Sequence, residues 1–437
     1  MKMDDMILIS TDDHICEPPT IFDNYKGKYK DQFPKCVSKD GIDAWEFNGK
    51  RAANLALNAV VGRRREEYGL EPKAFNELRK GCYDAKARLD DMNINGVLAS
   101  LNFNQFTGHG AQAFMCDDPK LSNTIVTAYN DWHIDEWCAT APGRFIPNII
   151  MPHWDVEAAV AEAIRAHEKG CNGISMLPTP NREGFPSWNS GYWDPLLQVC
   201  NDRGIVINTH IADATIATPS PESTVDVFVT NMPVTLFVTA SDILWSHIPK
   251  KFPKLRFSLA EGSAGWIPHL KERADFTFHH HGAWTHSPSS MPEGMLPSEV
   301  FDRMFINCFI FDRYAIKNRE DVGIDNMTWE CDYPHSDCTW PKSPETLFPQ
   351  LEGCSDEDIN KITHLNAMKA FHFDPFKYID KKDATVAALR KQAPKEDLSY
   401  LEGGGIKTHD VGTRPTMGDM AKRMSEAYSS DSWMGEV

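Results

Sequence analysis

Residues 6–14 read MILISTDDH, an apolar run that ends in three ionisable residues. Met6–Thr11 is rich in branched aliphatic side chains, which is typical of a buried β-strand. Residues two apart in a strand point to the same side, so Asp12 and His14 share one side and Asp13 faces the other. The stretch therefore predicts a buried strand with two potential metal ligands at its carboxyl end.

Seven further apolar segments follow, separated by helix-like or loop segments. They are 96–102 (GVLASLN), 145–151, 173–177, 205–209 (IVINT), 255–259, 304–309 and 326–330. Between them lie amphipathic stretches such as Val156–Lys169, and Tyr192–Arg203 precedes Gly204 as a helix precedes its C-cap glycine. Strands that alternate with helices predict an α/β fold, a (β/α)₈ TIM barrel. An open doubly wound sheet is the alternative, but no GxGxxG motif follows the first strand.

The chain is longer than a plain barrel. It has 437 residues, whereas a plain (β/α)₈ barrel needs roughly 250. We expect the barrel to span residues 1–372, with an insertion at about 20–80 after the first strand. Residues 373–437 are a polar C-terminal extension with a short helical stretch near Thr385–Lys391. This extension is either disordered or wraps a neighbouring subunit.

Charge and composition exclude several classes of partner. A net charge of −17 argues against nucleic acid or an anionic membrane, because either would need a basic face. The eleven cysteines form no CxxC pair, which fits reduced thiols in the cytosol. We see no signal peptide and no run of about 18 apolar residues. The sequence thus predicts a soluble, cytoplasmic protein that acts on a small molecule.

Ionisable residues stand where several predicted strands end. His210 ends the fifth strand, Glu261 follows the sixth and Asp332 follows the eighth. Each alone is most simply a polar residue at a strand end, but barrel enzymes build active sites at this edge. Together with the first strand, they supply the imidazole and oxygen ligands that divalent metals require.

Other histidines are weaker candidates. His335 lies three residues after Asp332 and is either an acid/base group beside the site or a residue of the rim. His279–His281 would lie roughly 25 Å from Glu261 if one helix carries them away from the strand.

Four motifs resemble one known family. DDHICEPP, INTH, EGSAGWIPHL and WECDYPHSDCTWP, spread over about residues 6–372, are similar to segments of the amidohydrolase-related (amidohydrolase 2) metalloenzymes. This family includes aminocarboxymuconate-semialdehyde decarboxylase and several aromatic-acid decarboxylases. The resemblance implies a (β/α)₈ barrel, and its ligand positions fall on Asp12, His14, His210 and Asp332.

The sequence departs from the decarboxylase pattern in its ligands. The usual His-x-His of the first strand is Asp12-x-His14, and Glu261 replaces a histidine of the sixth strand. The fourth strand also lacks a lysine that could be carboxylated to bridge two metals. With Asp332, the site carries three carboxylates, so two divalent cations would leave it with a net charge near +1. Glu261 would then bridge them.

This carboxylate-rich set resembles the dimetal branch that includes 2-aminoisobutyrate hydroxylase. The resemblance favours O₂-dependent hydroxylation of a small organic acid at a dinuclear Fe and/or Mn centre. The alternative is a metal-dependent hydrolase or non-oxidative decarboxylase that uses Zn, and a non-catalytic metal-binding subunit is a third interpretation. The expected metal ligands are Asp12, His14, His210, Glu261 and Asp332, and the expected catalytic residues are Asp332, His335 and Glu261. A homodimer, or a hetero-oligomer with a related subunit, is the expected assembly.

Overall fold

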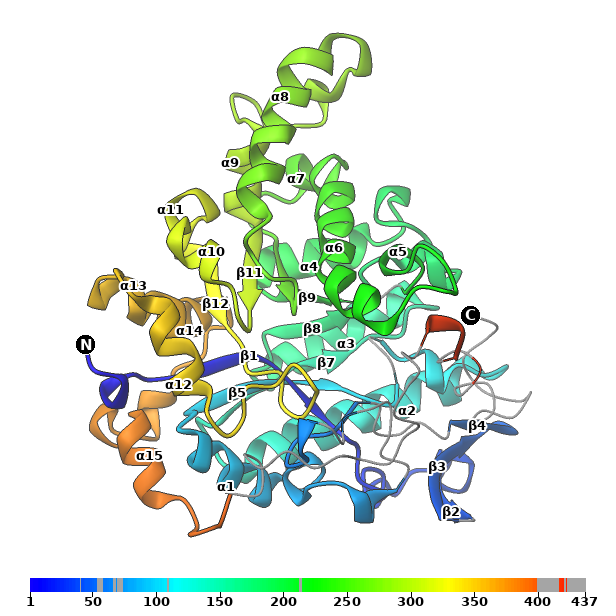
Figure 1. Cartoon of the computed structure of the whole chain (residues 1–437). Coiled ribbons are helices and arrows are strands. Elements are labelled where there is room, and N and C mark those ends of the chain that lie inside the picture. Colours follow the sequence, from blue (N-terminus) through cyan, green and yellow to red (C-terminus); the bar gives the residue numbers. More distant parts are fainter. Residues whose placement is uncertain are drawn as a thin grey trace.

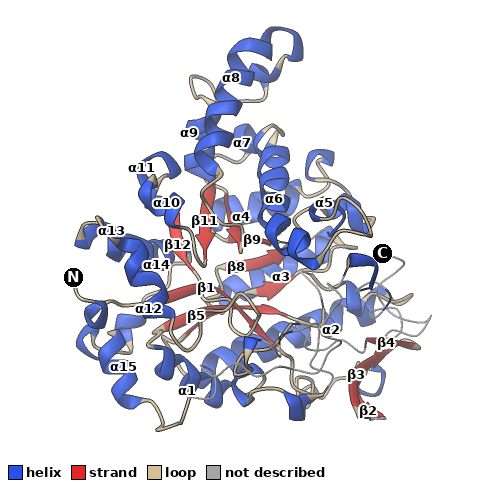
Figure 2. Ribbon diagram, viewed as in Figure 1, coloured by secondary structure: helices blue, strands red, loops and turns tan. Residues whose placement is uncertain are grey.

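Parallel strands occupy the centre of the molecule and helices surround them (Figures 1 and 2). The computed structural model describes residues 1–39, 41–52, 58–65, 68, 74–107, 110–211, 214–398, 416–419 and 422. Within these ranges the chain alternates between strand and helix, as the hydrophobic pattern predicts.

The central strands follow one another around a ring. One run of parallel neighbours is β1 (Ile9–Ile15), β5 (Ala99–Asn104) and β6 (Phe145–Ile146). The other is β7 (Ile149–Ile150), β8 (Gly173–Met176), β9 (Val206–His210), β10 (Arg256–Ala260), β11 (Phe305–Phe309) and β12 (Met327–Trp329). The ring closes where the Thr11 hydroxyl donates to Thr328 Oγ1 at 3.0 Å and Asp332 N donates to Asp12 O at 2.8 Å. The predicted TIM barrel is confirmed.

Two strands differ in detail from the prediction. The third was expected to run unbroken over residues 145–151, but Pro147 and Asn148 separate β6 from β7. Proline has no N–H to donate to a neighbouring strand, which explains the break. The first strand extends through His14 and shifts its register against β5 between Ser10 and Asp13. Such a bulge re-aims the side chains that follow it.

Sequence features fix where the barrel helices begin and end. Asp155 caps α3 (Val156–Glu168) by accepting the Ala158 N–H, and α4 (Asp194–Arg203) ends at Gly204 with a φ of 70°. The other long helices around the barrel are α1 (Ala85–Asn95), α2 (Pro119–Trp132), α6 (Val225–Leu244), α8 (Ile267–Thr285) and α9 (Pro297–Met304). These helices lie around the outside of the strands (Figure 2). The carboxyl ends of the strands, where barrel enzymes place their active sites, are therefore not covered by them.

The expected insertion forms a small antiparallel sheet beside the barrel. Its strands are β2 (Lys35–Lys39), β3 (Ile42–Phe47) and β4 (Lys50–Ala52), at the lower right of Figure 1. The segment that follows reaches the carboxyl edge of the barrel, where Val61 N donates to Pro334 O at 3.0 Å. The insertion therefore contacts the loop that follows the eighth barrel strand.

The first part of the C-terminal extension packs on its own barrel. Thr385 caps α15 (Val386–Gln392), and Val386 N donates to Met6 O at 2.9 Å. Leu389 is buried in one cluster with Ile7 and Leu98 at the start of two barrel strands. The prediction that the extension is disordered or wraps a neighbouring subunit covered residues 373–437, and nearly all of those beyond 398 lie outside the described residues.

Among the described residues, one helix, α6, is long and apolar enough to cross a membrane by length and composition, with a mean hydropathy of 1.5 over 18 residues. The expectation was that no unbroken run of about 18 apolar residues exists, and α6 is not such a run. Threonines and Asn231 interrupt its apolar residues. Its second half contributes Leu236, Ala240 and Ile243 to the core around the barrel.

Candidate metal centre

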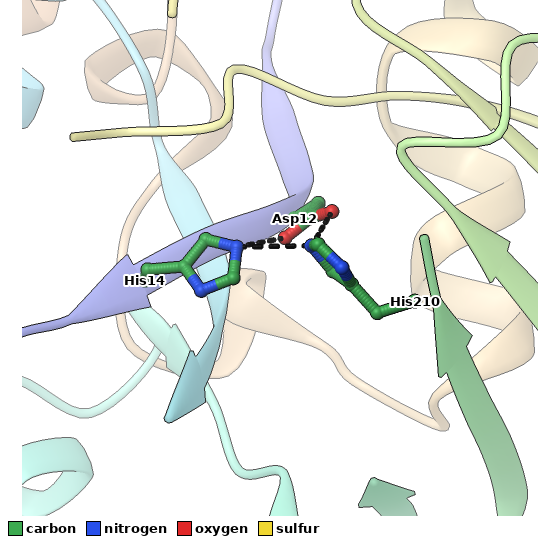
Figure 3. A group of neighbouring side chains, drawn as sticks. All are labelled: Asp12, His14 and His210. Atoms are coloured by element: carbon green, nitrogen blue, oxygen red, sulfur yellow. Dashed lines mark hydrogen bonds and ion pairs between the residues drawn. The ribbon is translucent and has the colours of Figure 1, made fainter. Parts of the chain in front are cut away.

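The first barrel strand brings two predicted ligands to the same place. Asp12 and His14 lie on β1 on either side of Asp13, and their side chains meet His210 at the end of β9 (Figure 3). His14 Nε2 lies 3.3 Å from Asp12 Oδ1, and His210 Nε2 lies 3.2 Å from Asp12 Oδ2. The two Nε2 atoms are 3.0 Å apart. All three residues are almost fully buried.

Backbone carbonyls set the orientation of the two rings. His210 Nδ1 lies 2.8 Å from Ile211 O, and His14 Nδ1 lies 3.5 Å from Asn104 O. A proton on Nδ1 satisfies each carbonyl and leaves the Nε2 lone pair to face the centre. This is the usual arrangement of metal-binding histidines.

The loop after β12 adds Asp332 and His335. Asp332 Oδ1 lies 3.6 Å from His14 Nε2 and 2.8 Å from His335 Nδ1. The His14 and His335 rings also lie near each other, with centroids 4.0 Å apart. Asp332 has a φ of 60°, a left-handed conformation that is rare outside glycine and clusters at functional sites. The loop therefore aims this carboxylate at the imidazoles at some cost in backbone energy.

Glu261 completes the set expected from sequence. It follows β10, and its Oε2 lies 3.3 Å from His210 Nε2. Like Asp332, it has a φ of 60°. The structure thus brings Asp12, His14, His210, Glu261 and Asp332 together, with each member within 3.6 Å of another.

The spacing of these atoms fits a bound cation. Two ligands bonded to an ion at about 2.0–2.2 Å stand about 2.8–3.6 Å apart in octahedral or tetrahedral geometry. The oxygens of Asp12 and Asp332 are fully buried, and the partners that the structure gives them are histidine ring nitrogens at 2.8–3.6 Å. Buried carboxylates are costly unless positive charge is nearby, and a cation would supply it.

The electrostatics agree with a cation site. Burial raises the pKa of Glu261 to about 8, although the nearby His210 acts in the other direction. Burial and the carboxylates of Glu261 and Asp12 raise the pKa of Asp332 well above its ordinary value. Burial opposes the charge on His210, but Asp12 and Glu261 outweigh it and raise its pKa to about 9. The carboxylates repel one another and attract whatever positive charge the centre holds.

One buried carboxylate was missed in the sequence analysis. Glu330 follows β12 directly and is fully buried, and its two carboxylate oxygens lie 3.1 and 3.2 Å from Glu261 N. Burial and the charge of Asp12 raise its pKa well above the usual range. The sequence does carry a signal for it, because Glu330 and Asp332 are two residues apart at one strand end and point to the same side.

Asp13 faces away from the centre, as predicted. Its Oδ1 accepts hydrogen bonds from the Ser10 hydroxyl and Tyr333 N, both at 3.0 Å. Arg88 lies on its other side, with Nη1 3.9 Å from Asp13 Oδ2, and donates to His14 O at 2.5 Å. These contacts tie β1 to the loop after β12, so they hold the ligand-bearing segments in register.

Solvent reaches the centre from one side. The Asp12 and Asp332 side chains are fully buried, but those of Glu261 and His335 are 12% and 11% exposed. His335 Nε2 also contacts Gln105 Oε1 at 3.0 Å. A cavity of about 420 Å³ lies elsewhere, between Trp245, His247 and Ser289 on the outer helices.

The His279–His281 run lies away from this group. Helix α8 continues unbroken to Thr285 and projects from the barrel at the top of Figure 1, and His279 and His280 are exposed. Among the described residues, the two clusters able to hold a metal are Asp12/His14/His210 and His14/Asp332/His335. The helix geometry expected from sequence explains why the run does not join them.

Known structures share this fold. An amidohydrolase from Mycobacterium avium subsp. paratuberculosis is 17% identical, with a TM-score of 0.64 over 84% of this chain and 99% of that chain. The 5-carboxyvanillate decarboxylase of Sphingomonas paucimobilis is 19% identical, with a TM-score of 0.58 over the same shares. The corresponding enzyme of Novosphingobium aromaticivorans, complexed with manganese and 4-hydroxy-3-methoxy-5-nitrobenzoic acid, is 18% identical, with a TM-score of 0.59 over 85% and 99%.

Two of these neighbours are named as decarboxylases, and one of them was solved with manganese. Comparison with curated proteins finds no match. The family model described as Amidohydrolase matches residues 62–373, most of the barrel. This chain is therefore a member of the amidohydrolase family, a metal-dependent enzyme on a TIM barrel.

Proposed function

We propose that this chain is a divalent-metal-dependent, non-oxidative decarboxylase of a hydroxylated aromatic acid. One arrangement carries the proposal: the Asp12, His14 and His210 cluster lies directly beside the Asp332–His335 pair. The cluster supplies a place for a cation, and the pair supplies a group that can hold and deliver a proton. Decarboxylation at an aromatic carbon requires both.

We infer that Asp12, His14, His210 and Asp332 would hold the ion, with the Glu261 carboxylate beside His210. Imidazole and carboxylate ligands suit Mn²⁺ and Zn²⁺, and a neighbour binds manganese. When bound, a divalent ion acts as a Lewis acid that holds an anionic substrate and stabilises the negative charge formed during the reaction.

His335 is the proposed proton donor. Its Nδ1 lies 2.8 Å from Asp332 Oδ1, which orients the ring, and its side chain is partly open to solvent. When the bond between the ring carbon and the carboxyl carbon breaks, the electron pair stays on the ring carbon and CO₂ leaves. A proton from His335 then bonds to that carbon, and solvent returns a proton to the imidazole.

The named substrates of the neighbours support a substrate class. Their named substrates are 5-carboxyvanillate and 2,6-dihydroxybenzoate, both aromatic acids with a hydroxyl group beside the carboxyl group. In this chain, the Phe103 ring packs against both ligand histidines, with centroids 5.7 Å from His14 and 5.1 Å from His210. We therefore expect an ortho-hydroxybenzoic acid rather than an aliphatic one.

A screen under anaerobic conditions tests this function. Protein loaded with Mn²⁺ or Zn²⁺ is incubated with a panel of hydroxybenzoic acids, and CO₂ and the phenol product are measured by mass spectrometry. Turnover without O₂ is the expected result. Turnover that appears only when O₂ is supplied and consumed would overturn the proposal.

The carboxylate content favours a second candidate, hydroxylation by O₂ at a two-ion centre. Asp12, Glu261, Glu330 and Asp332 together carry up to four negative charges, more than one divalent ion neutralises. The second cluster, His14 with Asp332 and His335, supplies ligands for another ion only if His14 is shared. Two Fe or Mn ions per chain together with O₂ consumption would favour this candidate, and one ion with anaerobic turnover would exclude it.

A further inference from the structure

Glu330 lies under the metal centre, and the proposed reaction gives it no role. The residue follows β12, its N–H donates to Phe309 O at 3.1 Å, and its side chain is fully buried. Burying a carboxyl group in the core is unfavourable unless hydrogen bonds compensate for the lost hydration. The contact that the structure gives it is with the backbone of Glu261.

This contact falls where Glu261 needs support. Strand β10 ends at Ala260, and Glu261 adopts a φ of 60°, a left-handed conformation that is rare for a residue with a side chain. Both Glu330 carboxylate oxygens accept from Glu261 N, at 3.1 and 3.2 Å. Without this acceptor, a backbone N–H would be left unsatisfied beside the barrel core, which is unfavourable.

The backbone conformation decides where the Glu261 side chain points. In the left-handed conformation its Oε2 lies 3.3 Å from His210 Nε2, at the edge of the centre. A return to the extended conformation of β10 would swing the Cα–Cβ bond away from His210. The carboxyl group of Glu330, charged or neutral, has lone pairs that accept the Glu261 N–H and thereby select the left-handed conformation.

We propose that Glu330 is a positioning residue that holds Glu261 at the metal centre through its backbone N–H. The proposal rests on the proposed metal site and is independent of which reaction that site performs. It predicts that an acceptor at position 330, rather than a negative charge, is what the centre requires. A direct ligand role for Glu330 is the competing explanation, and it requires the charge.

Two substitutions separate these explanations. Glu330→Gln keeps an amide oxygen that can accept the Glu261 N–H, whereas Glu330→Leu removes the acceptor at similar volume. The Kd for Mn²⁺ is measured from the electron paramagnetic resonance signal of the free ion, which needs no substrate. We expect Glu330→Leu to raise the Kd by about 10–100-fold, and Glu330→Gln by less than about threefold. Glu293→Gln, at an exposed glutamate, is the matched control and should leave the Kd unchanged.

A double-mutant cycle with Glu261→Gln completes the test. If Glu330 acts through Glu261, the double variant Glu261→Gln/Glu330→Leu binds Mn²⁺ no more weakly than Glu261→Gln alone. Equal losses in Glu330→Gln and Glu330→Leu, or additive losses in the double variant, would overturn the positioning role. If Glu330→Leu does not fold, as judged by circular dichroism, Glu330→Met replaces it in the same cycle. Because Mn²⁺ binding is the readout, a wrong assignment of the reaction leaves this result unaffected.

Discussion

The Nε2 atoms of His14 and His210 face each other at 3.0 Å, while the Nδ1 atom of each ring faces a backbone carbonyl. With the proton of each ring on Nδ1, two lone pairs point at one another and at the buried oxygens of Asp12. This arrangement is repulsive unless a positive charge lies among the three side chains, and either a proton on His210 or a bound cation supplies it. A divalent cation would displace that proton and take both Nε2 atoms and the Asp12 carboxylate as ligands.

The first prediction is that this pair makes the stability of the protein dependent on metal. Ligand present at about 100 times its Kd stabilises a folded protein by about 2.7 kcal/mol. We expect Mn²⁺ added to the metal-free protein to raise its Tm, and His210→Ala to abolish both the rise and the bound metal found by elemental analysis. His279→Ala, at an exposed residue of α8, should behave as the unmodified protein does. A full metal content in His210→Ala would remove His210 from the ligand set.

The second prediction concerns proton delivery by His335. In D₂O, a proton donor beside the centre should exchange the ring hydrogen of a phenol product, which is protonation of carbon in reverse. His335→Asn should slow this exchange, and decarboxylation of the accepted acid, by about 10²–10⁴-fold. Mn²⁺ affinity should change little, because His335 is not one of the proposed ligands. Nuclear magnetic resonance of the ring hydrogen measures the exchange.

The control for His335 is another histidine with a carboxylate partner. His247 Nε2 lies 2.7 Å from Asp194 Oδ1 on the outer helices, so His247→Asn breaks a similar pair away from the centre. We expect it to leave exchange unchanged. If His335→Asn exchanges as fast as His247→Asn, the donor is another group.

The barrel and most of its candidate site could be predicted from the sequence because both depend on patterns of neighbouring residues. Each strand is a short apolar run, and the residue at its end is carried to one common edge by the parallel fold. This rule alone predicts that Asp12, His14 and His210 lie together. The alternation of side chains along a strand predicts that Asp13 points to the other side.

The remaining features depend on contacts between distant segments. Nothing local in the sequence shows that Glu261 adopts a positive φ, or that its N–H meets Glu330, because their contact joins two different strand ends. The pairing of Asp13 with Arg88 is equally long-range, since α1 carries the arginine. The type of reaction could not be predicted from the ligands, because carboxylate-rich ligand sets suit both hydrolytic and redox-active ions.

The third prediction is that acid unfolds the protein through buried neutral histidines. His133 Nε2 accepts Asn148 N and His153 Nε2 accepts Leu177 N, both at 3.2 Å, so neither nitrogen has room for a proton. Burial lowers the pKa of His133 to about 4 and that of His153 to about 3, from 6.5. The folded pKa is thus below the unfolded one, so the stabilisation is complete above pH 6.5 and is lost as the pH falls toward 4.

Urea unfolding at a series of pH values measures this loss. Each group contributes a slope of up to about 1.4 kcal/mol per pH unit between pH 6.5 and its folded pKa. His153→Gln should reduce the slope by one proton, whereas His279→Gln, at an exposed position, should leave it unchanged. Equal slopes in both variants would show that His153 takes up its proton without unfolding.

The fourth prediction is that the helix of the C-terminal extension is part of the barrel rather than an appendage. Leu389 of α15 is 1% exposed and belongs to the same apolar cluster as Ile7 and Leu98, so it covers the amino-terminal end of the barrel. Removing a buried leucine side chain costs about 2–5 kcal/mol, because it loses apolar contacts and leaves a cavity. We expect Leu389→Ala to lower the free energy of unfolding in urea by this amount. Lys391→Ala, two residues further along the same helix and exposed, should change it by less than about 0.5 kcal/mol. Equal unfolding free energies for the two variants would mean that α15 is detached from the barrel in solution.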